Sequence, residues 1–242
     1  MNGRNEDEEM VFTFWEGQMP AYIKFCLETW QFPFTVLNYD NLNEHTDIDI
    51  EAVQQYSLPQ ISDIVRAHIL RDNGGWWLDA DTIMVTDKLM AENVIGNPET
   101  RHCDTGVCHG EKGDDFFVQW AEYQDKQIGK PSTGWSMFVN DFTDKYIREH
   151  EEIQIYDVKR CCPELRYWSP WNHEVRYQKF YFEDERHLAD FPDVEMFVLH
   201  NSWTPQMFKW GRSEMDIFYG RCTMSNILRE VRMQWREKKS GG

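Results

Sequence analysis

The sequence has no long apolar run. No stretch approaches the roughly 20 apolar residues that a helix needs to span a bilayer, and the first ten residues have no apolar core of the kind found in a signal peptide. It also has no internal repeats and no low-complexity linkers. We therefore expect a soluble, cytoplasmic protein without a leader peptide. Its 242 residues favour one large α/β domain over two small ones.

Basic residues are scarce. Lysine and arginine together number 25 against 42 acidic residues, which gives a formal net charge of −17. This charge repels polyanions, so we exclude nucleic acid as a partner. A nucleoside diphosphate would also be repelled unless a cation or a few basic groups masked its charge. The acidity therefore favours a metal-assisted site if such a ligand binds.

Cysteine is sparse and shows no spacing of a disulfide framework. A chain of this length can fold without cross-links, so we expect reduced thiols. The six cysteines are Cys26, Cys103, Cys108, Cys161, Cys162 and Cys222.

The order of apolar and turn-forming segments predicts an α/β fold, because it opens with strand, helix and strand. Strands are predicted over residues 10–15, 34–39, 76–85, 153–158, 179–182 and 195–200. Helices are predicted from Pro20, over 57–73, 116–123 and 141–150, and at the C-terminal end. The glycine-rich and polar stretch 97–113 is predicted to be a surface loop.

The helix at 57–73 carries two charged residues on one face. Ser57 with Gln60 resembles a capping box. Its buried stripe is expected to consist of Ile61, Ile64, Val65, His68 and Ile69. Asp63 and Arg66, three residues apart, then project together from the opposite side. The alternative is a surface ion pair, worth less than about 1 kcal/mol.

Two carboxylates follow the next predicted strand, in the run Gly74-Gly75-Trp76-Trp77-Leu78-Asp79-Ala80-Asp81. Asp79 and Asp81 point to the same side if the chain stays extended. Such a pair is costly to desolvate unless a cation joins it. Magnesium and manganese prefer oxygen ligands and could bridge these carboxylates to a pyrophosphate. A solvated acidic turn is the alternative.

These segments together resemble a known family. Ser62-Asp63-x-x-Arg66, Gly74-Gly75 and Asp79-x-Asp81, in this order, resemble the sugar-binding region of DXD glycosyltransferases. This group comprises capsular polysaccharide synthesis proteins, initiating mannosyltransferases and the catalytic domains of clostridial glucosylating toxins. The resemblance implies a single GT-A-like domain, with a Rossmann-like mixed sheet flanked by helices.

The implied domain spans residues 10–242 after a flexible acidic N-terminus at 1–9. Its nucleotide-sugar-binding part is expected over about 10–110 and its acceptor-side part over about 111–242. The segment 134–136, around Trp135, is a candidate acceptor loop, with an aromatic turn as the alternative.

The resemblance also implies a metal centre. Asp79 and Asp81 would hold Mn²⁺ or Mg²⁺, and His200, in a segment that resembles the family's closing segment, is the best third ligand. Asn201 or Ser202 could replace it, and His200 could instead be a structural histidine.

A donor site follows from the same likeness. Trp15 would stack on the donor base, with a core position as its alternative, and Ser62 would assist the base. Asp63 and Arg66 would hold donor-sugar hydroxyls, while Asn201 and Trp203 would meet the phosphates. The resemblance assigns catalytic roles to Asp63, Arg66, Asp81 and Trp203.

The expected activity is transfer of a sugar from a UDP- or GDP-sugar to a hydroxyl of a glycan, polysaccharide or lipid-linked saccharide, with retention. The C-terminal helix has an apolar stripe at Met224, Ile227, Leu228, Val231 and Trp235 beside basic residues. Docking onto the domain is the favoured role of this helix. Peripheral contact with the inner face of a membrane is the alternative.

Two other functions stay open. The segment 79–83, with Asp114-Asp115, faintly resembles the motifs of aspartate-nucleophile phosphatases. A non-catalytic subunit that binds sugar nucleotides on the same fold is the second alternative, because a fold does not fix an activity.

Overall fold

The computed structural model describes residues 10–134, 136–164 and 173–240. The chain divides into two compact units, each built from segments that are distant in sequence. Unit 1 comprises Met1–Gly17, Pro33–Asp79 and Met90–Tyr156, and unit 2 comprises Gln18–Phe32, Ala80–Leu89 and Asp157–Gly242. The predicted acidic N-terminus and Trp135 lie outside the described residues. The division into a donor part and an acceptor part stays a prediction.

Unit 1 is built on a six-stranded sheet with the order β2-β1-β3-β6-β5-β7. The strands are β1 (Val11–Phe14), β2 (Thr35–Leu37), β3 (Gly75–Leu78), β5 (Val94–Asn97), β6 (His102–Gly110) and β7 (Ile155–Asp157). β1 pairs in parallel with β2 and β3, whereas β6 pairs antiparallel with β3 and β5. This mixed sheet confirms the predicted fold class.

The prediction of a loop over 97–113 is wrong, because this stretch contains the nine-residue strand β6. Thr105, Val107 and Cys108 of β6 are buried in the sheet. Gly110 at its end reflects close packing, since a Cβ there would lie 2.4 Å from the ring of Phe117. Glycine thus marks a close approach of a helix to the strand, and not a turn.

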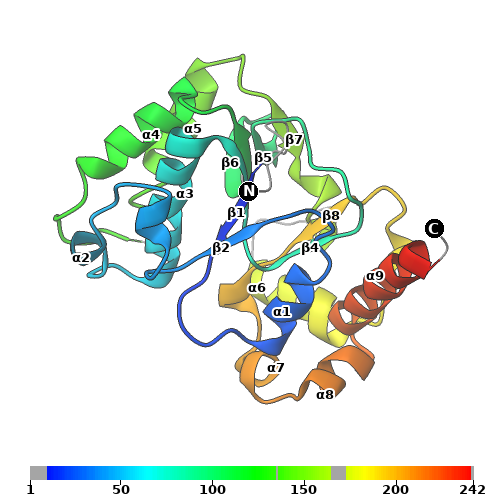
Figure 1. Cartoon of the computed structure of the whole chain (residues 1–242). Helices are drawn as coiled ribbons and strands as arrows, with labels where there is room; N and C mark the ends of the chain where they lie inside the picture. Colours follow the sequence, from blue (N-terminus) through cyan, green and yellow to red (C-terminus); the bar gives the residue numbers. More distant parts are fainter. Residues whose placement is uncertain (1–9, 135, 165–172, 241–242) are drawn as a thin grey trace. The chain divides into compact units, whose positions relative to one another are not determined.

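Unit 1 also contains helices. They are α2 (Ile50–Val53), α3 (Leu58–Asn73), α4 (Asp115–Asp125) and α5 (Asn140–Glu149), with a 3₁₀ turn η1 (Leu42–Glu44). α3, α4 and α5 lie side by side against the sheet (Figure 1). α3 begins at the predicted capping box, where the Ser57 N–H donates to Gln60 Oε1 at 3.2 Å. All five residues of its predicted stripe are buried.

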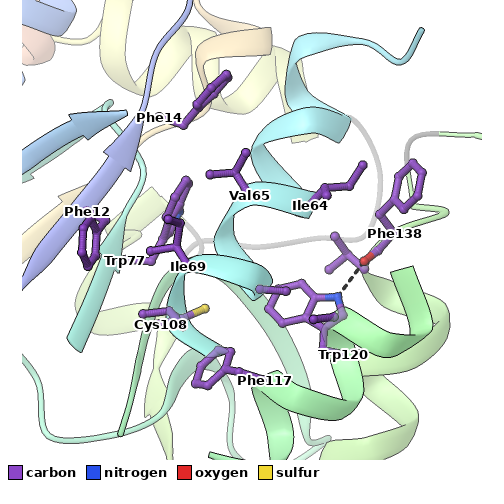
Figure 2. Packing of buried hydrophobic residues seen from close by; sticks show 14 of the residues in the cluster. Phe12, Phe14, Ile64, Val65, Ile69, Trp77, Cys108, Phe117, Trp120 and Phe138 are labelled. Atoms are coloured by element: carbon purple, nitrogen blue, oxygen red, sulfur yellow. Dashed lines mark hydrogen bonds between the residues drawn. The ribbon is translucent and has the colours of Figure 1, made fainter. Parts of the chain in front are cut away.

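Aromatic residues fill the core between α3 and the sheet. Trp77 of β3 and Ile69 of α3 are fully buried members of one cluster (Figure 2). The buried indole of Trp120 donates to the carbonyl of Phe138 at 2.7 Å. Because a close-packed interior resists displacement, this core fixes α3, which carries Asp63 and Arg66, and the end of β3, which Asp79 follows.

Gly75 lets β1 and β3 approach each other. Its φ is +88°, and a Cβ there would lie 2.3 Å from the carbonyl oxygen of Met10. Only glycine satisfies both the left-handed backbone and the close contact. The second glycine of the predicted motif therefore has a structural reason that is independent of any ligand.

Unit 2 contains a two-stranded antiparallel sheet of β4 (Thr82–Met84) and β8 (Met196–Val198). Its helices are α1 (Ala21–Leu27), α6 (His173–Gln178), α7 (Gln206–Trp210), α8 (Glu214–Tyr219) and α9 (Thr223–Ser240). Short 3₁₀ turns are η2 (Val158–Arg160), η5 (Leu188–Asp190) and η6 (Asn201–Trp203). The predicted helix after Pro20 and the predicted strand at 195–200 are confirmed.

Two strand predictions are wrong in detail. The strand predicted over 76–85 is split into β3 and β4, which belong to different sheets, and the chain turns at Ala80 and Asp81. The strand predicted over 179–182 is the π-helical segment η4 (Lys179–Glu183). The neighbours Phe180 and Tyr181 are both buried there, whereas neighbouring residues of a strand face opposite sides.

The last helix packs within unit 2. All five residues of its predicted apolar stripe are buried, and the indole of Trp235 donates to the carbonyl of Met84 at 3.3 Å. Docking of this helix onto the protein is thus confirmed. Within the described ranges, no helix is long and apolar enough to cross a membrane. All six cysteines are buried, and none of them forms a disulfide.

Candidate functional site

The first cluster of predicted site residues lies in unit 1 around Arg66. This arginine is 4% exposed, and its guanidinium binds Asp79 Oδ1 at 2.6 Å and Asp63 Oδ1 at 3.3 Å. It also donates to the hydroxyl of Thr105 on β6. The pair of Asp63 and Arg66 is therefore not a surface ion pair. The structure brings Asp63, Arg66 and Asp79 together as the sequence predicted.

Asp79 follows the last residue of β3 and is held from two sides. Its Oδ1 accepts from Arg66 and also from the indole Nε1 of Trp77 at 2.8 Å. The guanidinium of Arg66 lies 5.2 Å from the centroid of the Trp77 ring, a cation–π distance. The Asp79 side chain is still 32% exposed. The carboxylate is thus oriented by the protein and open to a ligand.

Negative charge exceeds positive charge in this cluster. The pKa of Asp63 is raised to about 7, chiefly by burial and also by the charges of Asp79 and Asp104, against the opposing effect of Arg66. Burial also raises the pKa of Asp79, although Arg66 and Trp77 oppose this. One arginine therefore neutralises several carboxylates only in part. A bound cation, or hydroxyl groups that donate hydrogen bonds to these carboxylates, would stabilise their charge.

Nε of Arg66 and the indole Nε1 of Trp15 are among the donors of unit 1 that are buried without a partner in the described part of the chain. Trp15 follows β1, and its backbone N–H donates to the carbonyl of Leu37 at 2.9 Å. An unsatisfied buried donor is costly, so both atoms suit an acceptor supplied by a ligand. Ser62 is half-buried beside Asp63, and its role stays a prediction.

The second cluster lies in unit 2 around Asp81. This aspartate is 6% exposed, and its Oδ2 accepts from the backbone N–H of Asn201 at 2.7 Å. The side-chain oxygen of Asn201 accepts from the hydroxyl of Tyr22 on α1. The premise of an extended chain from 79 to 81 is wrong, because Asp81 lies in a turn. Asp81 is held by a backbone amide that a buried tyrosine helps to position.

Tyr177 of α6 organises the segment after β8. Its hydroxyl oxygen lies 3.2 Å from the backbone nitrogen of His200 and 3.2 Å from Thr204 Oγ1. The ring of Trp203 packs 4.2 Å from that of His200 and 5.8 Å from that of Tyr177, measured between centroids. Burial raises the pKa of Tyr177 and of Tyr22, so both hydroxyls keep their protons. His200, Asn201 and Trp203 thus lie on one braced turn.

Sequence reasoning missed Tyr22, Tyr177 and Thr105. Tyr22 precedes Ile23 on the apolar side of a short helix, and it is fully buried. A buried tyrosine needs a partner for its hydroxyl. That requirement signals a polar neighbour but does not identify it, since Asn201 lies 179 residues further along the chain.

The predicted metal site is chemically plausible but remains a prediction. Asp79 and Asp81 offer carboxylate oxygens, which are the ligands that manganese and magnesium prefer. Within residues 10–134, 136–164 and 173–240, no group of three or more His, Cys, Asp or Glu side chains is arranged to hold a metal ion. The third ligand, predicted to be His200, therefore has no support from a preformed ligand set.

A separate open pocket of about 640 Å³ lies in unit 2. Arg160, Phe191, Glu195 and Glu230 are among its lining residues. None of the predicted site residues lines it, so this pocket does not coincide with the acidic clusters.

Comparison with known proteins identifies the class and then the family. The profile of capsular polysaccharide synthesis proteins matches residues 2–188, which include Asp63, Arg66, Asp79 and Asp81. The protein is thus a glycosyltransferase-type enzyme, as predicted. The chain belongs to the family of capsular polysaccharide synthesis proteins. The match ends before His200, so the closing segment lies beyond it.

Two solved structures are similar over most of this chain. One is the PaToxG glycosyltransferase, with 10% identity, 92% of this chain and 86% of that chain covered, and a TM-score of 0.44. The other is the glycosyltransferase GlyE of Streptococcus pneumoniae TIGR4, with 12% identity, 96% and 64% covered, and a TM-score of 0.44. These low scores add nothing to the assignment. No curated protein matches the chain.

Proposed function

We propose that this protein transfers a sugar from a UDP- or GDP-sugar to a hydroxyl of a glycan, a polysaccharide or a lipid-linked saccharide, with Mn²⁺ or Mg²⁺ as cofactor. One observation carries the proposal. Arg66 is buried among the carboxylates of Asp63 and Asp79, and its Nε has no partner within the described residues. A buried ion cluster with an unsatisfied donor lowers the stability of the folded protein. A ligand rich in hydroxyl groups would supply the missing hydrogen-bond partners.

The covalent chain supports a shared role for the two predicted metal ligands. Asp79 ends a segment of unit 1, and Asp81 is the second residue of the following segment of unit 2. Across one intervening residue, two α-carbons are at most about 7.6 Å apart. Asp79 and Asp81 would hold the ion, with His200 as the proposed third ligand. The ion would supply Lewis-acid assistance to the departing diphosphate.

Asp63 and Arg66 would bind the hydroxyls of the donor sugar. Thr105 and Asp79 already fix the guanidinium of Arg66, so its orientation costs little at the moment of binding. Fixed hydrogen-bonding groups hold the anomeric carbon in line with the acceptor. The carboxylate of Asp79, about one-third exposed, belongs to the same cluster as Asp63 and Arg66.

The remaining residues would hold the nucleotide. Trp15 would stack on the base, a contact worth about 1 to 3 kcal/mol, with Ser62 beside it. Asn201 and Trp203 would donate to the diphosphate from the turn that Tyr177 braces. We assign no protein base, since front-face attack by the acceptor hydroxyl, with retention, does not require one. A cytoplasmic location belongs to this proposal. Contact of α9 with a membrane surface, the alternative to docking, would have to use its basic residues, since its apolar stripe is buried.

A screen of UDP- and GDP-sugars tests the proposal. Purified protein is incubated with each donor, with MnCl₂ or with EDTA, and release of the nucleoside diphosphate is measured. We expect manganese-dependent hydrolysis of at least one donor. Hydrolysis of simple phosphomonoesters without any effect on nucleotide sugars would favour a phosphatase. Tight donor binding without hydrolysis or transfer would favour a non-catalytic subunit.

A further inference from the structure

A buried lysine of unit 2 has no partner. Lys209 lies on α7, it is 8% exposed, and no hydrogen bond or salt bridge holds its ammonium group in the part of the chain that the structure describes. Lysine is almost never fully buried unless it is paired. Here the aliphatic stem is buried, whereas Nζ is not among the buried atoms that lack a partner, so the ammonium group stays accessible to a ligand. A lysine at such a position needs an explanation beyond packing.

The electrostatic surroundings of Lys209 point to the acidic cluster of unit 2. Burial lowers the pKa of Lys209, whereas the negative charge of Asp81 acts to raise it. Asp81 is the only charged group with a resolved effect on this lysine among the described residues. The ammonium group is therefore within electrostatic reach of the aspartate, yet no salt bridge joins them.

Packing also connects α7, the helix of Lys209, to the cluster around Asp81. Phe208, next to Lys209, packs its ring 6.0 Å from that of Tyr22. Tyr22 in turn binds Asn201, whose backbone N–H binds Asp81. Within unit 2, α7 lies beside α1, the helix that carries Tyr22 (Figure 1). Lys209 thus belongs to the surroundings of Asp81 by both packing and charge.

We propose that Lys209 binds the diphosphate of the nucleotide-sugar donor. This inference rests on the proposed function. A diphosphate would supply the negative partner that this accessible ammonium group lacks among the described residues, and a lysine binds such a group as a compact point charge. A protein with a formal charge of −17 also needs a local cation to accept a nucleotide. No bond is made or broken at Lys209, which acts in binding.

The binding of UDP and GDP, each compared with its nucleoside, tests this role. Isothermal titration calorimetry with MnCl₂ is run on the full-length wild type, Lys209→Met, Lys209→Arg and the control Lys24→Met. Lys24 is an exposed lysine on α1 of the same unit. We expect Lys209→Met to weaken diphosphate binding by about tenfold to a hundredfold and to leave nucleoside binding unchanged. Lys209→Arg should retain most of the affinity, and Lys24→Met all of it.

The outcomes separate this inference from the proposed function. If wild type and Lys209→Met bind the diphosphate equally, the role of Lys209 is overturned while the proposed function stands. Equal losses for diphosphate and nucleoside, or a melting temperature of Lys209→Met below that of the wild type, would assign Lys209 to folding and also overturn it. A wild type that binds neither UDP nor GDP contradicts the proposed function itself.

Discussion

Asp79 and Asp81 are two residues apart in the sequence, yet the structure holds them by different means. Asp79 is about one-third exposed and is oriented by side chains, the guanidinium of Arg66 and the indole of Trp77. Asp81 is almost fully buried and is held by the backbone N–H of Asn201. A charged side chain donates to Asp79, whereas a neutral backbone N–H donates to Asp81.

Because the two aspartates are held by different groups, we expect variants at the two clusters to affect different properties, the stability of the fold in one case and the activity in the other. Removing the cation next to Asp79 leaves buried carboxylates unpaired, so unit 1 should lose stability. Replacing Asp81 by its amide keeps an oxygen that can accept from the Asn201 N–H, so unit 2 should keep its fold. The same residue type thus leads to opposite expectations for variants at neighbouring positions.

The largest expected effect is on activity, in Asp81→Asn. The amide removes a carboxylate ligand, so we expect donor hydrolysis and transfer to fall by at least about a thousandfold. The melting temperature should stay within 1 to 2 °C of that of the wild type, a shift of about half a kcal/mol. Initial rates with MnCl₂ and a thermal melt measure both. Asp87→Asn, at an exposed aspartate of the same unit, is the matched control. Normal turnover in Asp81→Asn would remove Asp81 from the metal site.

Arg66→Met should produce the next largest effect, on stability. It leaves Asp63 and Asp79 without their cation, and breaking a buried pair typically costs about 3 kcal/mol or more. We expect a fall in melting temperature of about 10 °C, read by differential scanning calorimetry.

Arg71→Met is the control for this variant, since Arg71 lies on the same helix and its partners, Asp47 and Asp72, are 85% and 28% exposed. Such surface pairs contribute less than about 1 kcal/mol. Similar losses in the two arginine variants would contradict the view that charge holds the first cluster together.

A smaller effect on rate is expected for Trp203→Phe. If its indole N–H stabilises charge that develops on the departing phosphate, turnover should fall on the order of a hundredfold with little change in acceptor KM. Steady-state kinetics at varied acceptor concentrations separate the two parameters. Trp210→Phe, at a half-exposed tryptophan on α7, controls for the loss of an indole. A change confined to acceptor KM would reject the assignment.

The smallest effect is a pH dependence of stability that comes from Asp63. Its pKa is raised from 3.8 to about 7 on folding, so the folded protein binds an extra proton between these values. The resulting stabilisation is fully present below pH 3.8 and is lost as the pH rises through about 7.

Asp63→Asn removes this titration. The difference in melting temperature, wild type minus Asp63→Asn, should therefore fall by a few °C between pH 5 and pH 8 in buffer with EDTA. A difference that stays constant over this range would show that Asp63 is already ionised at pH 5.

Much of the fold could be predicted because local signals agree with the tertiary structure. α3 has both a capping box and a strong apolar stripe, and α9 has a stripe of five buried residues. β6 was missed because glycine in its sequence reflects the close approach of Phe117, which periodicity cannot show. The π-helical segment at 179–183 was missed because its aromatic residues are typical of strands.

The site was predictable where its residues lie close together in the sequence. Asp63, Arg66 and Asp79 span 17 residues and converge as expected. Their burial was not predicted, since arginine on the polar side of a helix normally faces water. Tyr22 and Lys209 were missed because their significance depends on the cluster around Asp81, which joins segments far apart in the chain.

Because the two units are interleaved in the sequence, neither can be expressed separately as one continuous fragment of the chain. The backbone passes from one unit to the other at 17/18, 32/33, 79/80, 89/90 and 156/157, so neither unit is a continuous stretch. A truncated clone that stops at residue 110 would encode parts of both and the whole of neither. Expression of isolated halves should therefore yield insoluble or protease-sensitive products, and complementation would need both fragments to be made together.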